Sequence, residues 1–243
     1  MRIMDELEFI YRFEFAAGDK EEVVVRLDKA TLEPCPEVNA NSNENSNASP
    51  PDWTRLDFHQ CPHCPLAVSE RPHCPIAVQL AKLTALCERL LSHDKVKLEV
   101  VSAERTITNQ TTAQRAVSSL MGLIFATSGC PHTVFLKPMA RFHLPLASEE
   151  ETLYRASSMY LLAQYFRSKQ GLAADLELAE LKGLYIALHQ VNSAMAERLR
   201  AIIHKDSAVN AVVLLDLFAK ALPYSIAESL EEIRYSFKVY LEE

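Results

Sequence analysis

One short phrase occurs twice in this chain, and it holds the residues best suited to chemistry. Residues 62–68 read Pro-His-Cys-Pro-Leu-Ala-Val, and residues 72–78 read Pro-His-Cys-Pro-Ile-Ala-Val. A reversed variant, Cys-Pro-His, occupies residues 130–132. Proline follows each of four cysteines in these phrases: Cys61, Cys64, Cys74 and Cys130. Proline restrains the backbone beside each thiol, and thiolates gathered on stiff turns bind soft metals. The pattern therefore predicts a metal centre.

Four thiolates are enough for tetrahedral zinc or for a cubane iron–sulfur cluster, and the spacing leaves both open. The spacing of Cys61 and Cys64 lets two thiolates on one turn bind the same metal ion, as in zinc sites. A Cys-Pro step also occurs among ferredoxin ligands, which favours an iron–sulfur cluster. Three neighbouring histidines are candidates to replace a thiolate: His63, His73 and His132. A closed zinc site implies a structural role, and a cluster implies redox chemistry or sensing.

A second interpretation leaves the thiols without metal. Cys61 and Cys64 would then cycle between dithiol and disulfide, as in a thioredoxin-like site. Such a motif normally opens a helix after a strand, and Pro65 with no strand before it fits that context poorly. The two remaining cysteines fall outside the phrases. Cys87 is expected to be a small core residue, and Cys35 supports no interpretation.

Polar residues inside apolar runs suggest a third interpretation, an enzyme whose active site lies among the helices. Asp216 interrupts a strongly apolar stretch, where a carboxylate needs a partner such as Arg115, Arg141 or His143. His189 stands near Asn192, less than one helical turn further along, and the two are expected to form a hydrogen-bonded interior pair. Whether the chain is an enzyme stays open at this stage.

The elements that must position these residues begin with an expected hairpin over residues 1–33. Residues 7–15 alternate strictly, which places Phe9, Tyr11 and Phe13 on one face of a strand. A fourth interpretation makes that aromatic face a docking surface for a partner protein. Residues 34–58, rich in proline and asparagine, are expected to be a solvated linker or loop. The cysteine segment, a second hairpin and a helical bundle are expected over 59–243.

Apolar spacing predicts a helix over residues 76–92 and a second hairpin over 95–108 that shares a sheet with the first. Five helices then follow, bounded by caps and glycines: 111–129, 148–169, 175–203, one from 206 that ends before Pro223, and one capped by Ser225. Short loops between helices are typical of a bundle. The expected fold is therefore α+β: mainly a helical bundle, with a small antiparallel sheet of two hairpins.

The composition narrows the classes of function. The 243 residues carry a net charge of −7 with basic residues scattered among acids, which argues against nucleic-acid binding. No run of apolar residues is long enough to span a membrane, and the acidic N-terminus lacks a secretory core. We expect a cytoplasmic protein, where disulfides are rare and clustered cysteines favour metal or redox chemistry. A protein partner or a homo-oligomer remains open.

Several stretches together resemble an uncharacterised bacterial family of unknown function. They are the hairpin segment Tyr11-Arg12-Phe13-Glu14-Phe15, the phrase Cys61-Pro-His-Cys-Pro-Leu, the phrase Ser128-Gly-Cys-Pro-His132, Arg141-Phe-His-Leu-Pro145 and Met159-Tyr-Leu-Leu-Ala-Gln-Tyr165. The resemblance covers most of the chain and implies an intracellular bacterial protein whose Cys-Pro steps act as a unit. It implies no activity.

Overall fold

The computed structural model describes residues 6–16, 18–36 and 49–241, without the side chains of residues 218 and 221–229. Its first half holds β1 (Glu6–Phe15), β2 (Lys20–Asp28), η1 (Asp52–Thr54), α1 (Pro75–Leu80), η2 (Ala81–Leu83), α2 (Thr84–Cys87), β3 (Lys95–Val101) and β4 (Thr106–Thr112). Its second half holds α3 (Ala113–Thr127), η3 (Val134–Leu136), α4 (Lys137–Arg141), α5 (Glu149–Lys169), α6 (Ala179–Arg200), α7 (Ser207–Ile233), η4 (Arg234–Phe237) and α8 (Lys238–Leu241).

The two hairpins form one antiparallel sheet of four strands in the order β2-β1-β3-β4. Alternation explains its two faces: on β1, Phe9, Tyr11 and Phe13 are buried, whereas Arg12 points to solvent. Arg12 lies opposite Glu22 on one neighbouring strand and Glu99 on the other, and it pairs with both. The expected α+β class and the shared sheet of two hairpins are confirmed.

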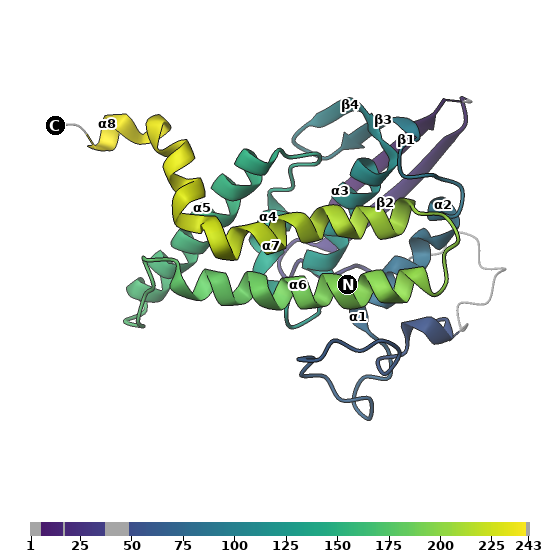
Figure 1. Ribbon diagram of the computed structural model, residues 1–243, viewed down its shortest axis with the longest axis horizontal. Helices are drawn as coiled ribbons and strands as arrows, with labels where there is room; N and C mark the ends of the chain where they lie inside the picture. Colours follow the sequence, from purple (N-terminus) through teal and green to yellow (C-terminus); the bar gives the residue numbers. More distant parts are fainter. Residues whose placement is uncertain (1–5, 17, 37–48, 242–243) are drawn as a thin grey trace.

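The helices cover the inner face of this sheet. Figure 1 shows α6 and α7 side by side, with α3 between them and the strands, and α8 extending away from the body. One cluster of buried residues runs from Leu7 of β1 through α3 to Val212 of α7, so sheet and bundle share a core. A second, smaller cluster lies where α5, α6 and α7 meet around Tyr160 and Tyr185.

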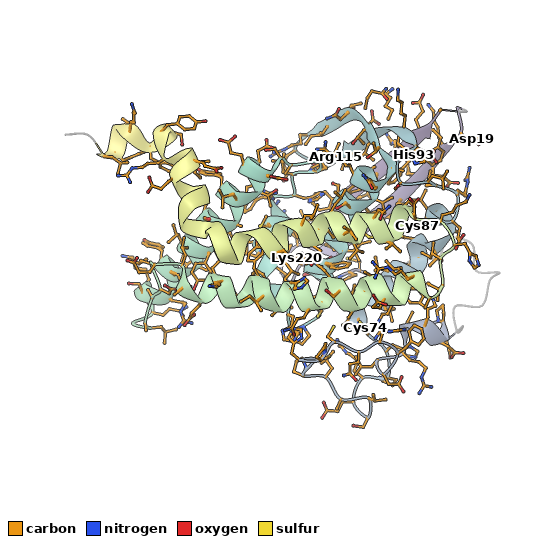
Figure 2. The ribbon with its side chains drawn as sticks, in the orientation of Figure 1. Asp19, Cys74, Cys87, His93, Arg115 and Lys220 are labelled. Carbon is orange, nitrogen blue, oxygen red and sulfur yellow. The ribbon has the colours of Figure 1, made fainter. Side chains whose placement is uncertain are left out.

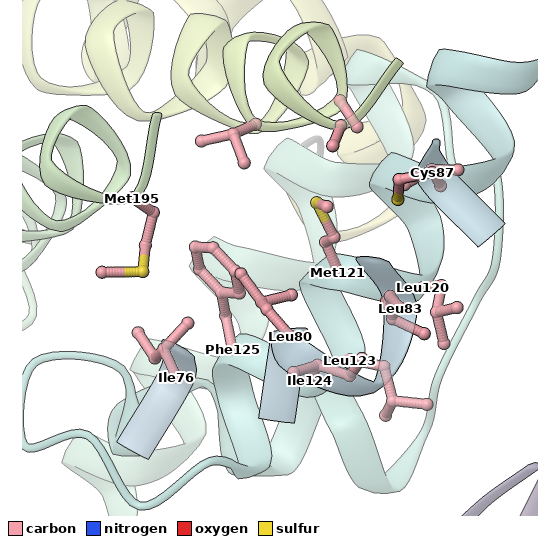
Figure 3. Packing of buried hydrophobic residues seen from close by; sticks show 14 of the residues in the cluster. Ile76, Leu80, Leu83, Cys87, Leu120, Met121, Leu123, Ile124, Phe125 and Met195 are labelled. Carbon is pink, nitrogen blue, oxygen red and sulfur yellow. The ribbon is translucent and has the colours of Figure 1, made fainter. Parts of the chain in front are cut away.

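The chain after Cys74 supplies one wall of the larger cluster. The expected helix over residues 76–92 is instead three short pieces, α1, η2 and α2, and it ends at Cys87. Its apolar face is nevertheless the predicted one, since Ile76, Leu80 and Leu83 are buried. Figure 3 shows them beside α3 residues such as Phe125, with Met195 of α6 on the other side.

Two predicted helix boundaries are wrong. The helix expected from residue 175 begins at Ala179, because the Asp175 carboxylate accepts hydrogen bonds from the backbone amides of Glu177 and Glu180 and holds a turn. The helix expected to end before Pro223 continues to Ile233, so the last two predicted helices are one. A proline inside a helix removes one hydrogen bond, and α7 continues through Pro223 despite that loss.

The expected linker over residues 34–58 is only partly tested. Residues 37–48, which contain most of its asparagines, lie outside the described residues. The end of the range is not a solvated linker, because Thr54 and Leu56 are buried in the core. Beyond them, the loop of residues 59–74 lies under α6 (Figure 1) and carries three of the four Cys-Pro steps.

Candidate metal centre

Two of the Cys-Pro steps form the same kind of turn. In Cys61-Pro-His-Cys64, the amide of Cys64 donates to the carbonyl of Cys61 at 3.0 Å. In Cys130-Pro-His-Thr133, the amide of Thr133 donates to the carbonyl of Cys130, also at 3.0 Å. Proline occupies the second position of both turns, where its fixed φ angle suits the geometry. The repeated phrase thus encodes a repeated backbone shape with a thiol at its start.

These two turns face each other although about seventy residues separate them. The rings of His63 and His132, each at the third position of its turn, stack with centroids 3.9 Å apart. Nε2 of His132 also lies 2.9 Å from the carbonyl oxygen of His63, at hydrogen-bond distance. Cys130 reaches this place because α3 ends just before it, where Gly129 turns the chain with a φ of +84°. The turns bring Cys61 and Cys64 toward Cys130.

The third Cys-Pro step starts a helix. Cys74 is the N-cap residue of α1, and Pro75 takes the first helical position, where a missing amide costs nothing. The amide of Cys74 donates to the carbonyl of Thr54 at 2.7 Å. His73 is engaged by the same threonine, its Nδ1 lying 2.7 Å from the Thr54 hydroxyl oxygen. Cys74 is therefore held by backbone contacts on both sides.

The four thiols are close enough to influence one another's ionisation. Burial raises the pKa of Cys61 to about 12, and the nearby thiols of Cys74, Cys130 and Cys64 raise it further in that direction. Burial likewise raises the pKa of Cys130 to about 11, with Cys74 and Cys64 acting in the same sense. Such thiols stay protonated at neutral pH, which disfavours the metal-free dithiol interpretation because a reactive cysteine needs a lowered pKa.

The other two cysteines lie elsewhere. The pKa of Cys87 is raised to about 12 by burial and by Glu88, with no contribution from another thiol. In Figure 2, Cys87 is drawn near the start of α7, apart from Cys74, which lies under α6. Cys35 is half-buried beside β2, where its amide donates to the carbonyl of Arg26. Cys87 is the core residue that the sequence predicts.

A buried cation accompanies the four thiols. Arg198 of α6 is only 1% exposed, and its guanidinium donates to the carbonyls of Trp53, Arg55 and Leu56 at 2.7–3.0 Å. Burial lowers its pKa, and the thiolates of Cys74, Cys61 and Cys64 oppose that effect. No carboxylate among the described residues forms a salt bridge with it. The Asp57 carboxylate acts in the same direction as the thiolates, without a salt bridge.

Two properties decide whether these residues could bind a metal: the type of their donor atoms and the distances between them. Four thiols on stiff turns are a donor set typical of zinc and of iron–sulfur clusters. As they stand, no group of three or more Cys, His, Asp or Glu side chains within the described residues is placed to hold a metal ion. The thiols converge on one region without closing around a point. The donor set fits a metal, and the spacing does not fit a single ion.

The three candidate histidines have different surroundings. His73 has Nδ1 committed to Thr54, and His132 has Nε2 committed to the carbonyl of His63. Neither ring nitrogen of His63 makes a hydrogen bond within the described residues, and both are shielded from solvent. Burial lowers the pKa of His63, and the neighbouring His132 lowers it further. The backbone of Ala187 opposes these effects, so the imidazole of His63 is neutral but has a backbone neighbour.

The residues of the enzyme interpretation do not come together. Arg141 pairs with Glu104 at the surface. Arg115, His143 and Asn192 line the large pocket among the helices, whereas Asp216 and His189 are not among its lining residues. The partners proposed for Asp216 are wrong. Its carboxylate lies 2.6 Å from Nδ1 of His189 and 2.9 Å from Nζ of Lys220. Asp216 is therefore paired with residues of α6 and α7 rather than with the arginines or His143.

The interior pair expected of His189 and Asn192 is also different. Each contacts Asp216 rather than the other, with Nδ2 of Asn192 3.5 Å from the carboxylate. The carboxylate is therefore shared between α6 and α7. Oδ1 of Asn192 is buried and makes no hydrogen bond within the described residues.

The aromatic face of the first hairpin is not a docking surface. Phe9, Tyr11 and Phe13 are at most 5% exposed and pack on the protein's own helices. The Tyr11 hydroxyl makes a short hydrogen bond with Nε2 of His143 and lies 3.3 Å from the carbonyl of Ser119. The partner interpretation for this face loses its basis.

Sequence reasoning missed Arg198, although a signal was present. Leu188, Val191 and Met195 follow one apolar stripe of α6, and Arg198 continues that stripe at the next step. A charged residue on a buried stripe needs a compensating group. The compensating carbonyls belong to residues 53–56, which are far from Arg198 in the sequence. No local sequence pattern identifies them as its partners.

Comparisons with known proteins add one relationship. No curated protein and no solved structure matches the chain. Within the described residues, no helix is both long and apolar enough to cross a bilayer. A family match extends over residues 9–238, nearly the whole length, and includes all four Cys-Pro steps. The chain belongs to the family described as a domain of unknown function (DUF6901).

Proposed function

We propose that this protein binds an iron–sulfur cluster through Cys61, Cys64, Cys74 and Cys130, and that it serves in redox chemistry or sensing. The observation that carries the proposal is the convergence of four Cys-Pro thiols from three separate turns on one buried region. Proline beside each thiol keeps the backbone in place before a ligand arrives. Metal binding would displace the protons of these thiols, and coordination would supply the free energy for that step.

We favour a cluster over zinc as the occupant, because a cubane accepts thiols that are more widely spaced. Around zinc, four sulfurs meet one ion at about 2.3 Å each, so they must lie close together. In a cubane each thiolate binds a different iron, so the ligating sulfurs lie further apart. The described thiols interact electrostatically yet are not placed around a single ion. A bound cluster would supply the uptake and release of single electrons.

Arg198 provides charge balance for such a centre. Four thiolates outweigh the positive charge of either a zinc ion or a cluster core, so the centre would be anionic. A buried guanidinium beside three of the thiols stabilises that anion, and the anion in turn stabilises the guanidinium. For a cluster, a nearby positive charge also raises the reduction potential, since it favours the more negative, reduced state.

The test is an anaerobic purification followed by a visible spectrum, iron and acid-labile sulfide analysis, and zinc analysis on one sample. We expect a brown protein with broad absorbance near about 400 nm and iron matched by sulfide. A colourless protein with about one zinc per chain would replace the cluster with a structural zinc site. Neither metal at meaningful occupancy would overturn the proposal.

Two pairs of variants assign the ligands. Cys64→Ala and Cys130→Ala remove one thiol from each of the facing turns, and each is expected to lose most of the metal. Cys35→Ala and Cys87→Ala are the matched controls, since neither thiol contributes to the group of four. Full metal content in both Cys64→Ala and Cys130→Ala would show that the cluster, or the zinc, is held elsewhere.

A further inference from the structure

A large pocket lies between the two hydrophobic clusters, and none of the four Cys-Pro thiols lines it. Its volume is about 500 Å³, and its walls come from α3, the segment of residues 136–148, α5, α6 and α7. Protein interiors are otherwise close-packed, and an engineered void of about 150 Å³ already counts as large. A pocket of this size is in the range of about 300–1,000 Å³ that is typical of sites for small organic ligands.

The walls are mainly apolar, but they also include the charged residues Arg115, Glu149 and Arg155. Leu123, Leu136, Met139 and Leu188 are among the apolar residues that line the pocket. A ligand with an apolar body is therefore favoured. His143 also lines the pocket, and its pKa is lowered to about 3 by burial and by the nearby Arg155. The imidazole is neutral at ordinary pH, so it adds no charge to the pocket.

Arg155 of α5 is the half-buried charged residue of this pocket, whereas Arg115 and Glu149 are exposed. Its NH2 group donates to the carbonyls of Met139 at 2.9 Å and Phe142 at 2.8 Å, which uses both hydrogens of that nitrogen. Its Nε and NH1 groups make no hydrogen bond with the described residues, and no described carboxylate forms a salt bridge with it. Burial lowers its pKa, and the nearby Glu151 carboxylate opposes that effect only in part.

We propose that this pocket binds an organic monocarboxylate with an apolar tail, its carboxylate paired with Arg155 and its tail against the leucines and methionine of the walls. The remaining guanidinium donors supply charge-assisted hydrogen bonds, which a carboxylate accepts well. Pairing offsets the cost of a partly buried cation that forms no salt bridge with a described carboxylate. The proposal is independent of the metal centre.

The test is titration of the full-length protein with octanoate and with 1-octanol, which has an equally long tail and no carboxylate, by isothermal calorimetry. We expect octanoate to bind at least about tenfold more tightly, as one charge-assisted hydrogen bond implies. Arg155→Gln should remove that preference and leave 1-octanol binding within about threefold, a result that also shows the pocket to be intact. Equal affinity for the two compounds, or octanoate binding unchanged in Arg155→Gln, would overturn the proposal.

Three further variants locate the site. Leu215→Trp, which fills the pocket from α7, should abolish binding of both compounds, whereas Val213→Trp on the exposed side of α7 should leave both unchanged. Arg115→Gln removes the exposed guanidinium at the pocket's edge and should change octanoate affinity by less than about threefold. A loss in Arg115→Gln that equals the loss in Arg155→Gln would contradict Arg155 as the anchor.

Discussion

At the scale of single residues, Arg198 joins three distant parts of the chain. Its guanidinium donates hydrogen bonds to three backbone carbonyls of residues 53–56 and lies beside three of the four thiols. Its Nε is buried and makes no hydrogen bond within the described residues. A cation in this position is stable only if the carbonyl dipoles and the thiolate charges compensate for its lost hydration.

Replacing Arg198 with methionine should therefore be costly. The side chain keeps an apolar stem, but three buried carbonyls lose their donors, and each such loss costs about 1–3 kcal/mol. We expect Arg198→Met to lower the free energy of unfolding by about 3 kcal/mol or more, measured by urea denaturation. Arg200→Met is the control, because Arg200 lies two residues away on the exposed face and pairs only with Glu197. Equal stability of the two variants would contradict the buried role of Arg198.

His143 makes a pH prediction at the same scale. Its pKa is about 3 in the folded protein, and in the unfolded chain it has the ordinary value of about 6.5. Below pH 6.5 the unfolded chain binds a proton that the folded protein does not, so stability falls as pH falls. The slope is at most about 1.4 kcal/mol per pH unit for this one group, and it ends near the folded pKa.

The prediction is measured as the loss of unfolding free energy between pH 7 and pH 5 in urea. The wild-type protein should lose about 2 kcal/mol more than His143→Gln, which can still bond to Tyr11 but does not titrate. The carboxylates titrate in both proteins, so the difference isolates the histidine. An identical pH dependence in the two proteins would mean that His143 is not held neutral by burial.

At the scale of elements, the sequence predicts the helices and strands whose positions depend on a local pattern of residues. Alternation identified both hairpins, and Ser148 with Glu151 identified the start of α5, where both hydrogen bonds of the capping box are present. The errors arise where tertiary contacts outweigh the local signal. Pro223 does not end α7, and the Asp175 side chain replaces the first turn expected for α6.

In the candidate sites too, local features could be predicted from the sequence and tertiary contacts could not. The repeated phrase identified the four thiols because its chemistry is local. The pairing of Cys61-Pro-His-Cys64 with Cys130-Pro-His-Thr133 depends on how α3 packs, and no local pattern encodes that. Arg155 carried even less signal, because an arginine on a polar helix face is normally solvated. Its place in a pocket wall results from the angle at which α5 meets α6 and α7.

The capping box of α5 gives an element-scale prediction. Ser148→Ala removes the hydroxyl that accepts from the amide of Glu151 and leaves the first turn without its side-chain cap. We expect a loss of about 1 kcal/mol in unfolding free energy, with Ser148→Asp close to wild type because aspartate also caps. Urea denaturation followed by far-UV circular dichroism measures both. A loss in Ser148→Asp as large as that in Ser148→Ala would argue against the cap.

At the scale of the whole molecule, the loop of residues 59–74 is held by fewer contacts than the sheet and the helices. Sheet and helices share a continuous core, whereas few backbone hydrogen bonds hold the loop: among them are those within its turns and those to residues 54 and 56. Segments with few buried contacts open locally at low free-energy cost. The proposed centre would link this loop to α1 and to the end of α3, the points where Cys74 and Cys130 lie.

Metal binding should therefore change local opening far more than global stability. We expect backbone amides of residues 59–74 to exchange hydrogen at least about tenfold more slowly in the metal-loaded protein than after removal of the metal, because ligation must be broken before the loop opens. Amides of α3, residues 113–127, serve as the internal reference, since they open only with the core. Hydrogen exchange followed by mass spectrometry resolves the two regions in one sample. Slowing confined to α3, or equal in both regions, would place the metal's effect outside the loop and separate the thiol phrase from metal binding.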